Sequence, residues 1–509
     1  MKRVLLGAGW GALATCVLAC LAVAAPPQGG RQVGTIGPPP RKSPERQTSA
    51  EGMPPLPLPA TPLRRSEPKA EPAPPLFLGK LIYGDTHDYM PNPGDVDNLM
   101  RHVRAEVGLW YGWKLQNLNE LVALHKQGKT STLPALYLTG YQPFTLTADQ
   151  RAALRQYLLD GGTLIGDATL GSPAFTASFR NEVRAMFPDR AFDVLQVDHP
   201  IYRAFYKYAD VHYFNVEDGP GRATQGPPDL LGMNLGTRTA VIFSPYDMSC
   251  GWDQFIAPPS AQRAAQAPRS KAMLPGDAVR LGVNIVGYVA ALRQVAETEA
   301  VTHQVQGPRV RGRQQFTLAQ LRHQGDWNPD PNSSYQLLRE LAGDSSLAVN
   351  FDLKYVDPVE SQLAAYPFVY MTGFRDPKFT KEQVTALRHH LEAGGFLYVN
   401  NCSGYGEFDR HVRQLVAELF PDQKLAAVPP EHPIFRSFFT ITGGKDRQSG
   451  ADRPVELEGI TIKNRLVLVY SKNDAMSQLK QVSDPFGNGY DHETCRRLAV
   501  NIVAYALQN

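Results

Sequence analysis

Short apolar runs alternate with helical patterns through most of the chain. Residues 134–139 and 368–372 are apolar, β-branched or aromatic and each run precedes a Gly, which is typical of buried parallel strands. Thr147 and Thr380 each have a Gln three residues later, as in a helix capping box. A Gly-Gly pair then ends the helix, and another apolar run follows at once. This order predicts a strand–helix–strand unit in each half.

The two halves repeat the same landmarks in the same order, which indicates a duplicated domain. The matched positions include Gly161 and Gly394, Phe175 and Phe408, Arg180 and Arg413, His199 and His432, and Asp247 and Asp474. We therefore predict an α/β protein with two tandem, doubly wound parallel-sheet domains. Their expected bounds are 76–296 and 314–509, joined by a linker at 297–313. Residues 258–275 and 443–453 are expected to be exposed loops.

The first 75 residues follow two other patterns. Lys2 and Arg3 precede an uncharged run that ends in Ala22-Val23-Ala24, which predicts a secretory signal peptide at residues 1–25. A retained membrane anchor or a lipid anchor at Cys20 is the alternative. Residues 26–75 are rich in Pro and predict a disordered, extended linker. The body is thus expected outside the cytoplasm: periplasmic, secreted or associated with the cell envelope.

Composition narrows the range of partners. The chain has 52 Lys and Arg against 49 acidic residues, a net charge of +3, so a nucleic-acid partner is not expected. Three Cys would remain after signal cleavage: Cys250, Cys402 and Cys495. None of them lies in a Cys-x-x-Cys pair, and no metal site or cofactor is predicted. Contact with a membrane is expected only through the N-terminal segment.

The second half carries a family resemblance. Its landmarks are Tyr-Pro-Phe-Val-Tyr-Met-Thr-Gly at 366–373, Gly-Gly-Phe-Leu at 394–397, Phe-Asp-Arg at 408–410 and His-Pro-Ile-Phe at 432–435. This pattern resembles the bacterial family called domain of unknown function 4159. The first half is more divergent but keeps Ser-Pro-Tyr-Asp at 244–247. That family is similar to the class I glutamine amidotransferase-like superfamily, which includes trehalose-utilisation-type domains. The resemblance implies a flavodoxin-like fold and no particular activity.

A nucleophile is expected just after a strand, because ligands of open α/β sheets collect at the carboxyl ends of the strands. Cys402 lies there, two residues before Gly404, as in part of a nucleophile elbow. Asn400 replaces the first Gly of that motif, and Thr169 stands in the Cys position of the first copy. The alternative is that Cys402 is a small buried residue or half of a disulfide with Cys495.

The repeated His and Arg residues have two interpretations each. His432 and His199 are candidates for a general base or an anion ligand, and the alternative is that each imidazole caps a loop anchored by the Ile of His-Pro-Ile. Arg180 and Arg413 are candidates for binding a carboxylate or phosphate. The alternative for these two is an internal ion pair with Asp247 and Asp474.

Polar loops supply the remaining candidates for ligand binding. Asp85 and His87 follow the first strand of copy one, and Asp326 follows that of copy two. Local turn stabilisation explains the same residues. Asp167 and Asn400 follow the strand after the Gly-Gly pair in the two copies. An aromatic group that includes Trp110 and Trp113 could stack on sugars or lie between the two copies in an intramolecular pseudo-dimer.

These patterns support three hypotheses. The preferred one is an exported, non-catalytic binding or scaffold module whose partner is a protein or a ligand of the cell envelope. The second is a hydrolase or amidotransferase-type enzyme that uses Cys402 and His432. The third is a carbohydrate-related domain, which rests on fold analogy alone.

Overall fold

The computed structural model describes residues 73–216, 218–254, 271–300, 315–480, 482 and 484–509. The predicted signal peptide, and all but the end of the predicted Pro-rich linker, lie outside these residues. Most of the linker at 297–313 lies outside them too. No helix in the described part of the chain combines the length and apolar character needed to span a membrane.

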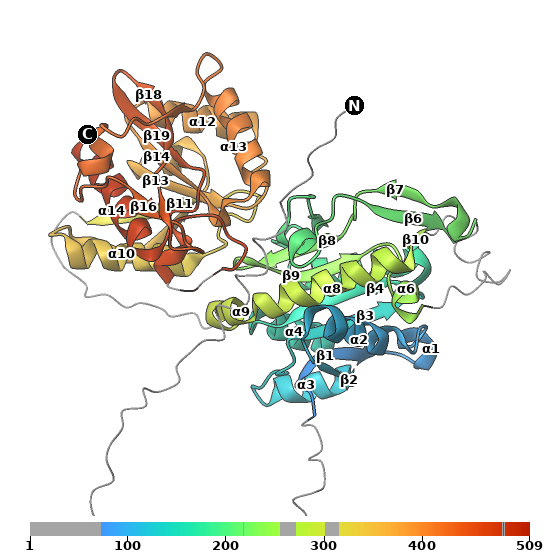
Figure 1. Cartoon of the computed structure of the whole chain (residues 1–509). Helices are drawn as coiled ribbons and strands as arrows, with labels where there is room; N and C mark the ends of the chain where they lie inside the picture. Colours follow the sequence, from blue (N-terminus) through green and yellow to red (C-terminus); the bar gives the residue numbers. More distant parts are fainter. Residues whose placement is uncertain (1–72, 217, 255–270, 301–314, 481, 483) are drawn as a thin grey trace, which may run out of the picture. The chain divides into compact units, whose positions relative to one another are not determined.

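The first half is built on a seven-stranded sheet (Figure 1). Its strand order is β2 (Gly112–Asn117), β1 (Leu76–Ile82), β3 (Ala135–Gly140), β4 (Thr163–Ala168), β9 (Arg238–Ser244), β8 (Leu231–Leu235) and β5 (Asp193–Val194). The five strands from β2 to β9 are parallel, whereas β8 and β5 are antiparallel to their neighbours. The sheet is therefore mixed and mostly parallel.

The second half repeats this topology strand for strand. Its order is β12 (Val349–Val356), β11 (Phe316–Leu321), β13 (Phe368–Gly373), β14 (Phe396–Asn401), β19 (Arg465–Ser471), β18 (Glu458–Ile462) and β15 (Ala426–Ala427). Again the last two strands are antiparallel to their neighbours. The predicted α/β class and the tandem arrangement are confirmed. The antiparallel edge was not predicted, because its strands are short and carry no signal of direction.

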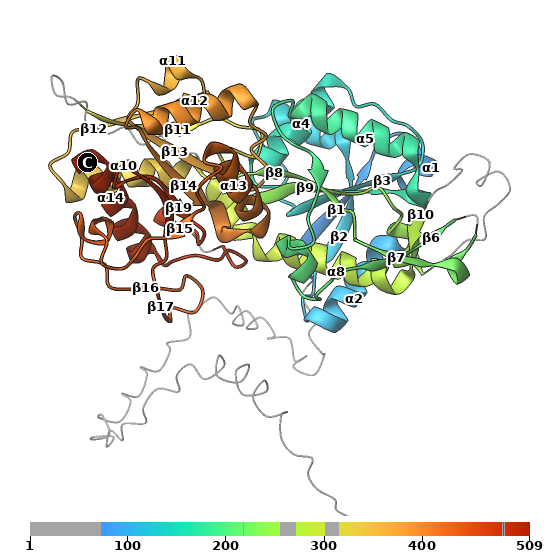
Figure 2. The ribbon, with the colours of Figure 1, turned by 90° about the horizontal axis from the view of Figure 1, so that it is seen from above.

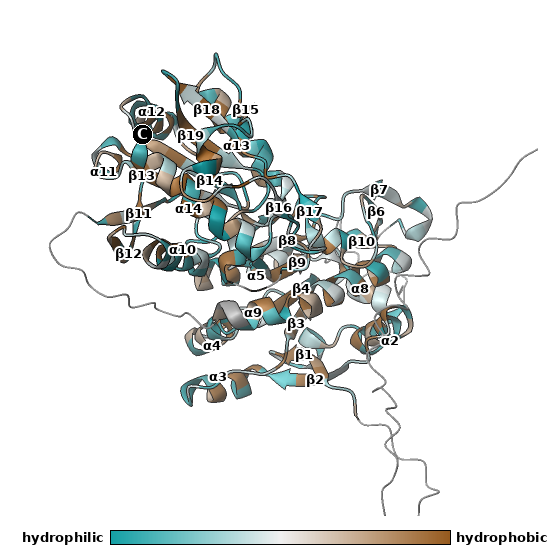
Figure 3. Cartoon of the chain, turned by 60° about the vertical axis from the view of Figure 1, so that its left-hand side comes forward, coloured by the Kyte–Doolittle hydropathy of each residue, from teal (hydrophilic) through white to brown (hydrophobic). Residues whose placement is uncertain are grey.

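Helices cover both faces of each sheet, as expected for strands that are apolar on both sides (Figures 2 and 3). In the first half one core contains side chains of α2 (Asp95–Val107) and α8 (Pro275–Ala291), and the other contains those of α3 (Leu118–Lys126), α4 (Ala148–Leu159) and α5 (Pro173–Met186). In the second half the corresponding helices are α10 (Pro331–Asp344) and α14 (His492–Gln508) on one face, and α12 (Lys381–Glu392) and α13 (Gly406–Leu419) on the other. Alternate strand residues thus enter different cores.

Shorter elements complete both halves. In the first they are α1 (Thr86–Tyr89), η1 (Thr169–Gly171), η2 (Pro200–Arg203), β6 (Val211–Asn215), η3 (Pro220–Arg222), β7 (Thr224–Gly226), α6 (Ser249–Asp253), β10 (Lys271–Met273) and α9 (Arg293–Ala300). In the second they are α11 (Glu360–Leu363), η4 (Cys402–Gly404), η5 (Pro433–Arg436), β16 (Gly444–Lys445), β17 (Asp452–Arg453) and η6 (Ser477–Lys480).

Three expectations about irregular segments differ from the structure or lie partly outside it. Residues 258–270 of the predicted loop at 258–275 lie outside the described residues, and residues 271–273 form β10. Helix α9 continues to Ala300 and so occupies the start of the predicted linker. Residues 443–453, expected to be a loop, contain the paired strands β16 and β17. Two-residue strands leave no periodic signal in a sequence.

The predicted capping boxes are present at both helices. The Thr380 hydroxyl accepts a hydrogen bond from the Gln383 backbone amide, and the Gln383 side chain accepts one from the Thr380 amide. Thr147 and Gln150 make the same two bonds at the start of α4.

Thr380→Ala is expected to lower the free energy of unfolding by about 1 kcal/mol, because an amide of the first turn loses its acceptor. Urea denaturation measures this. Thr385→Ala, which removes only a bond to the Lys381 carbonyl within the same helix, is the control and should change stability much less.

Candidate functional site

A strained turn follows the central strand β14 of the second copy. Ser403 has φ 56° and ψ 4°, a left-handed conformation that is uncommon outside Gly. Gly404 follows with φ +68°, and a Cβ there would lie 2.3 Å from the Asn488 carbonyl oxygen. The strand–turn–helix geometry of an elbow is thus present. The strained position belongs to Ser403, one residue after the predicted nucleophile Cys402.

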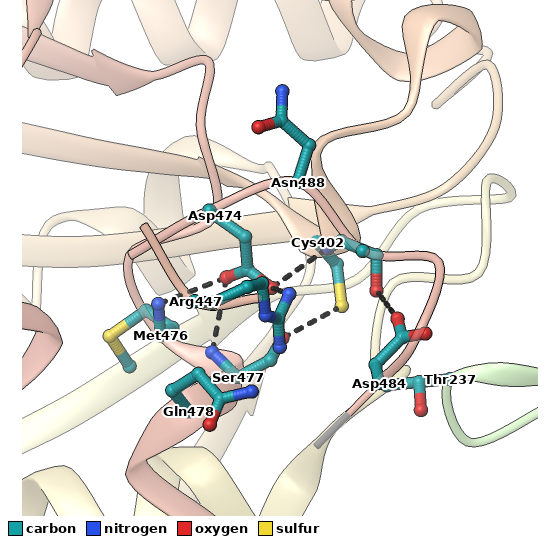
Figure 4. A network of polar contacts seen from close by, with 12 residues as sticks. Thr237, Cys402, Arg447, Asp474, Met476, Ser477, Gln478, Asp484 and Asn488 are labelled. Atoms are coloured by element: carbon teal, nitrogen blue, oxygen red, sulfur yellow. Dashed lines mark hydrogen bonds and ion pairs between the residues drawn. The ribbon is translucent and has the colours of Figure 1, made fainter. Parts of the chain in front are cut away.

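The Asp474 carboxylate organises this turn from the end of β19 (Figure 4). Its Oδ2 accepts from the Ser403 amide at 2.9 Å, and its Oδ1 accepts from the amides of Met476 and Ser477 at 3.0 Å. Asn400 also donates a hydrogen bond to this carboxylate, from its Nδ2 to Asp474 Oδ1 at 3.1 Å. Every one of these donors favours the charged carboxylate.

A buried cation balances that charge. Arg447 Nη1 lies 3.2 Å from Asp474 Oδ2, and both side chains are 1% exposed. Burial alone would raise the pKa of Asp474, but Arg447 and the hydrogen-bond donors outweigh it and lower the pKa. A second carboxylate, Asp484, accepts from the Ser403 hydroxyl at 2.8 Å. The turn is therefore held between two carboxylates and one guanidinium.

Cys402 points away from solvent in this turn. Its side chain is buried, and its Sγ lies 3.4 Å from the Ser477 hydroxyl. Burial, followed by the nearby Asp474 and Asp330, raises the pKa of the Cys402 thiol well above its usual range. Cys495 is also buried and free, so the alternative of a disulfide with Cys402 is not what the structure contains.

His432 lies elsewhere in the second copy. Its Nδ1 accepts from the Ile434 amide at 3.2 Å and its ring lies 5.3 Å from that of Tyr505. Within the described residues no hydrogen bond joins it to Cys402. His199 repeats this cap with the Ile201 amide. Both imidazoles thus cap the short helix of their His-Pro-Ile segment, the structural alternative considered from the sequence.

The first copy holds a related but differently charged cluster. Leu170 takes the strained position, with φ 56°, and its amide donates to Asp247 Oδ2 at 2.6 Å. Asp167 accepts from the amides of Met248 and Ser249. Burial, followed by the Asp247 charge, raises the pKa of Asp167 well above its ordinary value. Asp167 occupies the place of Asn400, and both side chains accept backbone amide bonds from the loop after the last parallel strand of their copy.

A buried ion pair lies beside this cluster. Lys80 Nζ is 2.7 Å from Asp95 and 3.0 Å from the Asn92 carbonyl oxygen. Burial raises the pKa of Asp95 to about 6, although Lys80 opposes the shift. Asn92 then donates to the Ser249 hydroxyl, which donates to Asp247 at 2.9 Å. Hydrogen bonds thus connect β1, the start of α2 and the segment at the start of α6.

Arg413 forms internal ion pairs, as one of its two interpretations expected, but Asp474 is not its partner. It bonds to Asp409 at 3.1 Å and to Glu458 at 2.9 Å. Arg180 lies with its guanidinium 6.0 Å from the Phe192 ring centre. The helical spacing placed both Arg residues correctly on α13 and α5 but gave no information on the direction of these long side chains.

The loops after the first strands have structural roles of their own. Asp85 caps α1 in a reciprocal capping box with Asp88, and His87 is exposed in that helix. Asp326 has φ +57° and lies 3.5 Å from Arg375 Nε. No hydrogen bond or ion pair connects these three residues with the strained turns within the described part of the chain. The candidates that the structure does bring together are Asn400 with Asp474, and Asp167 with the segment after Asp247.

Sequence reasoning missed Arg447, Asp484, Ser403 and the Lys80–Asp95 pair. Lys80 was detectable, because it is the one charged residue in the apolar run of β1. Arg447 lies in the segment taken for an exposed loop, so no periodic signal marked it. In the described residues no group of three or more His, Cys, Asp or Glu side chains is arranged to hold a metal ion.

The model of one protein family matches both halves of the chain. This family is the Domain of unknown function (DUF4159), and the match covers residues 78–290 and 317–507. The chain therefore belongs to the DUF4159 family. No curated protein matches the chain.

Proposed function

We propose that this DUF4159 protein is an exported, non-catalytic binding or scaffold module made of two α/β copies. The observation that carries the proposal is the enclosure of the Cys402 thiol, which is 1% exposed and has a raised pKa. A catalytic thiol needs a stabilised thiolate and a base within reach. Cys402 has neither the environment for a thiolate nor a contact with His432.

The first copy supports the same conclusion. Thr169 replaces Cys402, Leu170 replaces Ser403, and the Asp167 and Asp247 carboxylates bond to backbone amides of the neighbouring loop. Carboxylates that hold a turn by backbone bonds stabilise structure without needing a substrate. Both copies thus use the carboxyl edge of the sheet to fix loops.

Export and ancestry are further parts of the proposal. The charged start, apolar run and Ala-x-Ala sequence support secretion to the periplasm, the cell envelope or the medium. The positive φ after β14 supports the relationship to class I glutamine amidotransferase-like domains, because a nucleophile elbow has that geometry. The partner is proposed to be a protein or a cell-envelope ligand.

One observation favours an enzyme as the second candidate. Ser403 occupies the strained position and donates to Asp484, so a serine hydroxyl and a carboxylate are in contact at the elbow. However, the Ser403 side chain is buried, and within the described residues no imidazole bonds to it. The binding module is therefore the better-supported function.

Thiol alkylation of the folded full-length protein, with peptide mapping, tests the proposal. Because burial raises the thiol pKa, Cys402 and Cys495 in the folded protein should react much more slowly than the same cysteines in denaturant. Their alkylation rate should not reach a plateau near pH 7. Cys495 serves as the internal control, since it is equally buried and lies outside the turn. Selective, fast labelling of Cys402 at pH 6–7 would overturn the proposal.

A further inference from the structure

The guanidinium of Arg447 has an edge without a partner. Its Nη1 donates to Asp474, whereas its buried Nε and Nη2 donate to no acceptor among the described residues. Buried N–H groups are nearly always satisfied, and those of a charged group are the costliest to leave unpaired. The two unpaired donors of Arg447 are therefore unusual, and their pairing requires an acceptor.

The same edge is filled in other arginines of this chain. Arg496 donates from Nε and Nη2 to the two oxygens of Glu493, each at 2.8 Å. Arg151 uses the same two atoms for the two oxygens of Glu182. Nε and Nη2 thus form a planar fork suited to two adjacent oxygen atoms. In Arg447 the same two atoms have no acceptor among the described residues.

The charges around Arg447 favour one class of ligand over another. Asp474 and Asp484 both lie near Arg447 and favour its charged form. Two carboxylates against one guanidinium leave an excess of one negative charge, so an added anion would be repelled in this buried place. A neutral molecule with two adjacent acceptor oxygens avoids that cost.

A further unpaired group lies in the same region. Within the described part of the chain, the buried Tyr398 hydroxyl has no hydrogen-bond partner. Burial, and then nearby groups that include Cys495 and Asp474, raise its pKa well above the ordinary value, so it remains a neutral donor. Tyr398 is thus a second buried donor within electrostatic reach of Asp474 whose acceptor is not among the described residues.

We infer that the Nε–Nη2 fork of Arg447 binds a neutral polyhydroxylated molecule through two vicinal hydroxyl oxygens. This inference rests on the proposed binding function and names its ligand class. Arg447 is 1% exposed, and a Cβ on Gly487 would lie 2.4 Å from its Nη1, so the turn at Gly487 packs against the guanidinium.

Calorimetric titration of the full-length protein with myo-inositol and glucose tests the inference, with phosphate and acetate as anionic comparisons. Saturable binding of a polyol and none of the anions is expected. Arg447→Lys keeps the charge and removes the fork, so polyol affinity should fall about tenfold or more. Arg496→Lys, which alters a fork already filled by Glu493, is the matched control and should bind like the wild type.

A second measurement does not depend on a folded variant. In protein labelled with ¹⁵N-arginine, the Nε–H signal of Arg447 should shift on polyol addition while that of Arg496 stays unchanged. Absence of polyol binding, preference for phosphate or acetate, or binding that Arg447→Lys leaves intact overturns the inference. Fast alkylation of Cys402 together with polyol binding at Arg447 would refute only the non-catalytic function, so the two proposals fail separately.

Discussion

Asp474→Asn is expected to lower the free energy of unfolding of the second copy by about 3–5 kcal/mol. The substitution leaves Arg447 buried without its counter-ion. It also replaces one of the two oxygens that accept from the Ser403, Met476 and Ser477 amides. An uncompensated buried charge is among the most destabilising single changes in proteins. Urea denaturation at pH 7 measures the loss.

The pH dependence of this effect has a definite sign. The pKa of Asp474 is lower in the folded protein than its ordinary value. Its contribution is therefore complete above the unfolded-state pKa and is lost as the pH falls through the folded-state pKa. The difference between wild type and Asp474→Asn should shrink in acid. Asp422→Asn, which changes an exposed carboxylate of the same copy, is the control. If it lowers the free energy of unfolding as much as Asp474→Asn does, the central role of Asp474 is wrong.

Asn400→Asp should destabilise the second copy by about 3 kcal/mol at pH 8. In the wild type, Asn400 donates to Asp474 Oδ1 at 3.1 Å. In the variant, the new carboxylate would lie against that of Asp474. The new carboxyl should behave as Asp167 does beside Asp247, with a pKa raised by burial and by its neighbour.

The raised pKa decides whether the stability of the variant rises or falls with pH. The folded variant holds its proton at a pH where the unfolded chain has lost it, so stability falls as the pH rises through the folded-state pKa. The cost of Asn400→Asp should consequently be small at pH 4 and large at pH 8, by urea denaturation. The reciprocal change Asp167→Asn should flatten the pH dependence of the first copy. A pH-independent cost of Asn400→Asp would contradict the equivalence of the two positions.

The fold could be predicted from the sequence because its signals are local and occur twice. The Gly-Gly pairs, the capping boxes at Thr147 and Thr380 and the apolar runs each report on a few neighbouring residues, and all agree with the same unit. The repeated order of seven strands then confirms the duplication. The antiparallel edges escaped prediction, since strand direction depends on connections rather than on composition.

The candidate site could be predicted only in part. Asn400 was identified because it lies where a strand ends and ligands of open α/β sheets collect, and Asp474 because it matches Asp247 in the repeat. Arg447 reaches that edge from a segment of two-residue strands, whereas Arg413 pairs with Asp409 and Glu458. Long side chains span distances that sequence spacing does not encode. The shift of the strained position from Cys402 to Ser403 is likewise a property of backbone angles.

The most direct test of the non-catalytic account is the intact mass of the folded full-length protein after exposure to a fluorophosphonate at neutral pH. Such a probe modifies a serine only when that serine is an accessible, activated nucleophile. The account predicts an unchanged mass, because the Ser403 hydroxyl is buried and donates to Asp484. A single adduct that maps to Ser403, and that Ser403→Ala abolishes, would contradict the account and make this turn an active site.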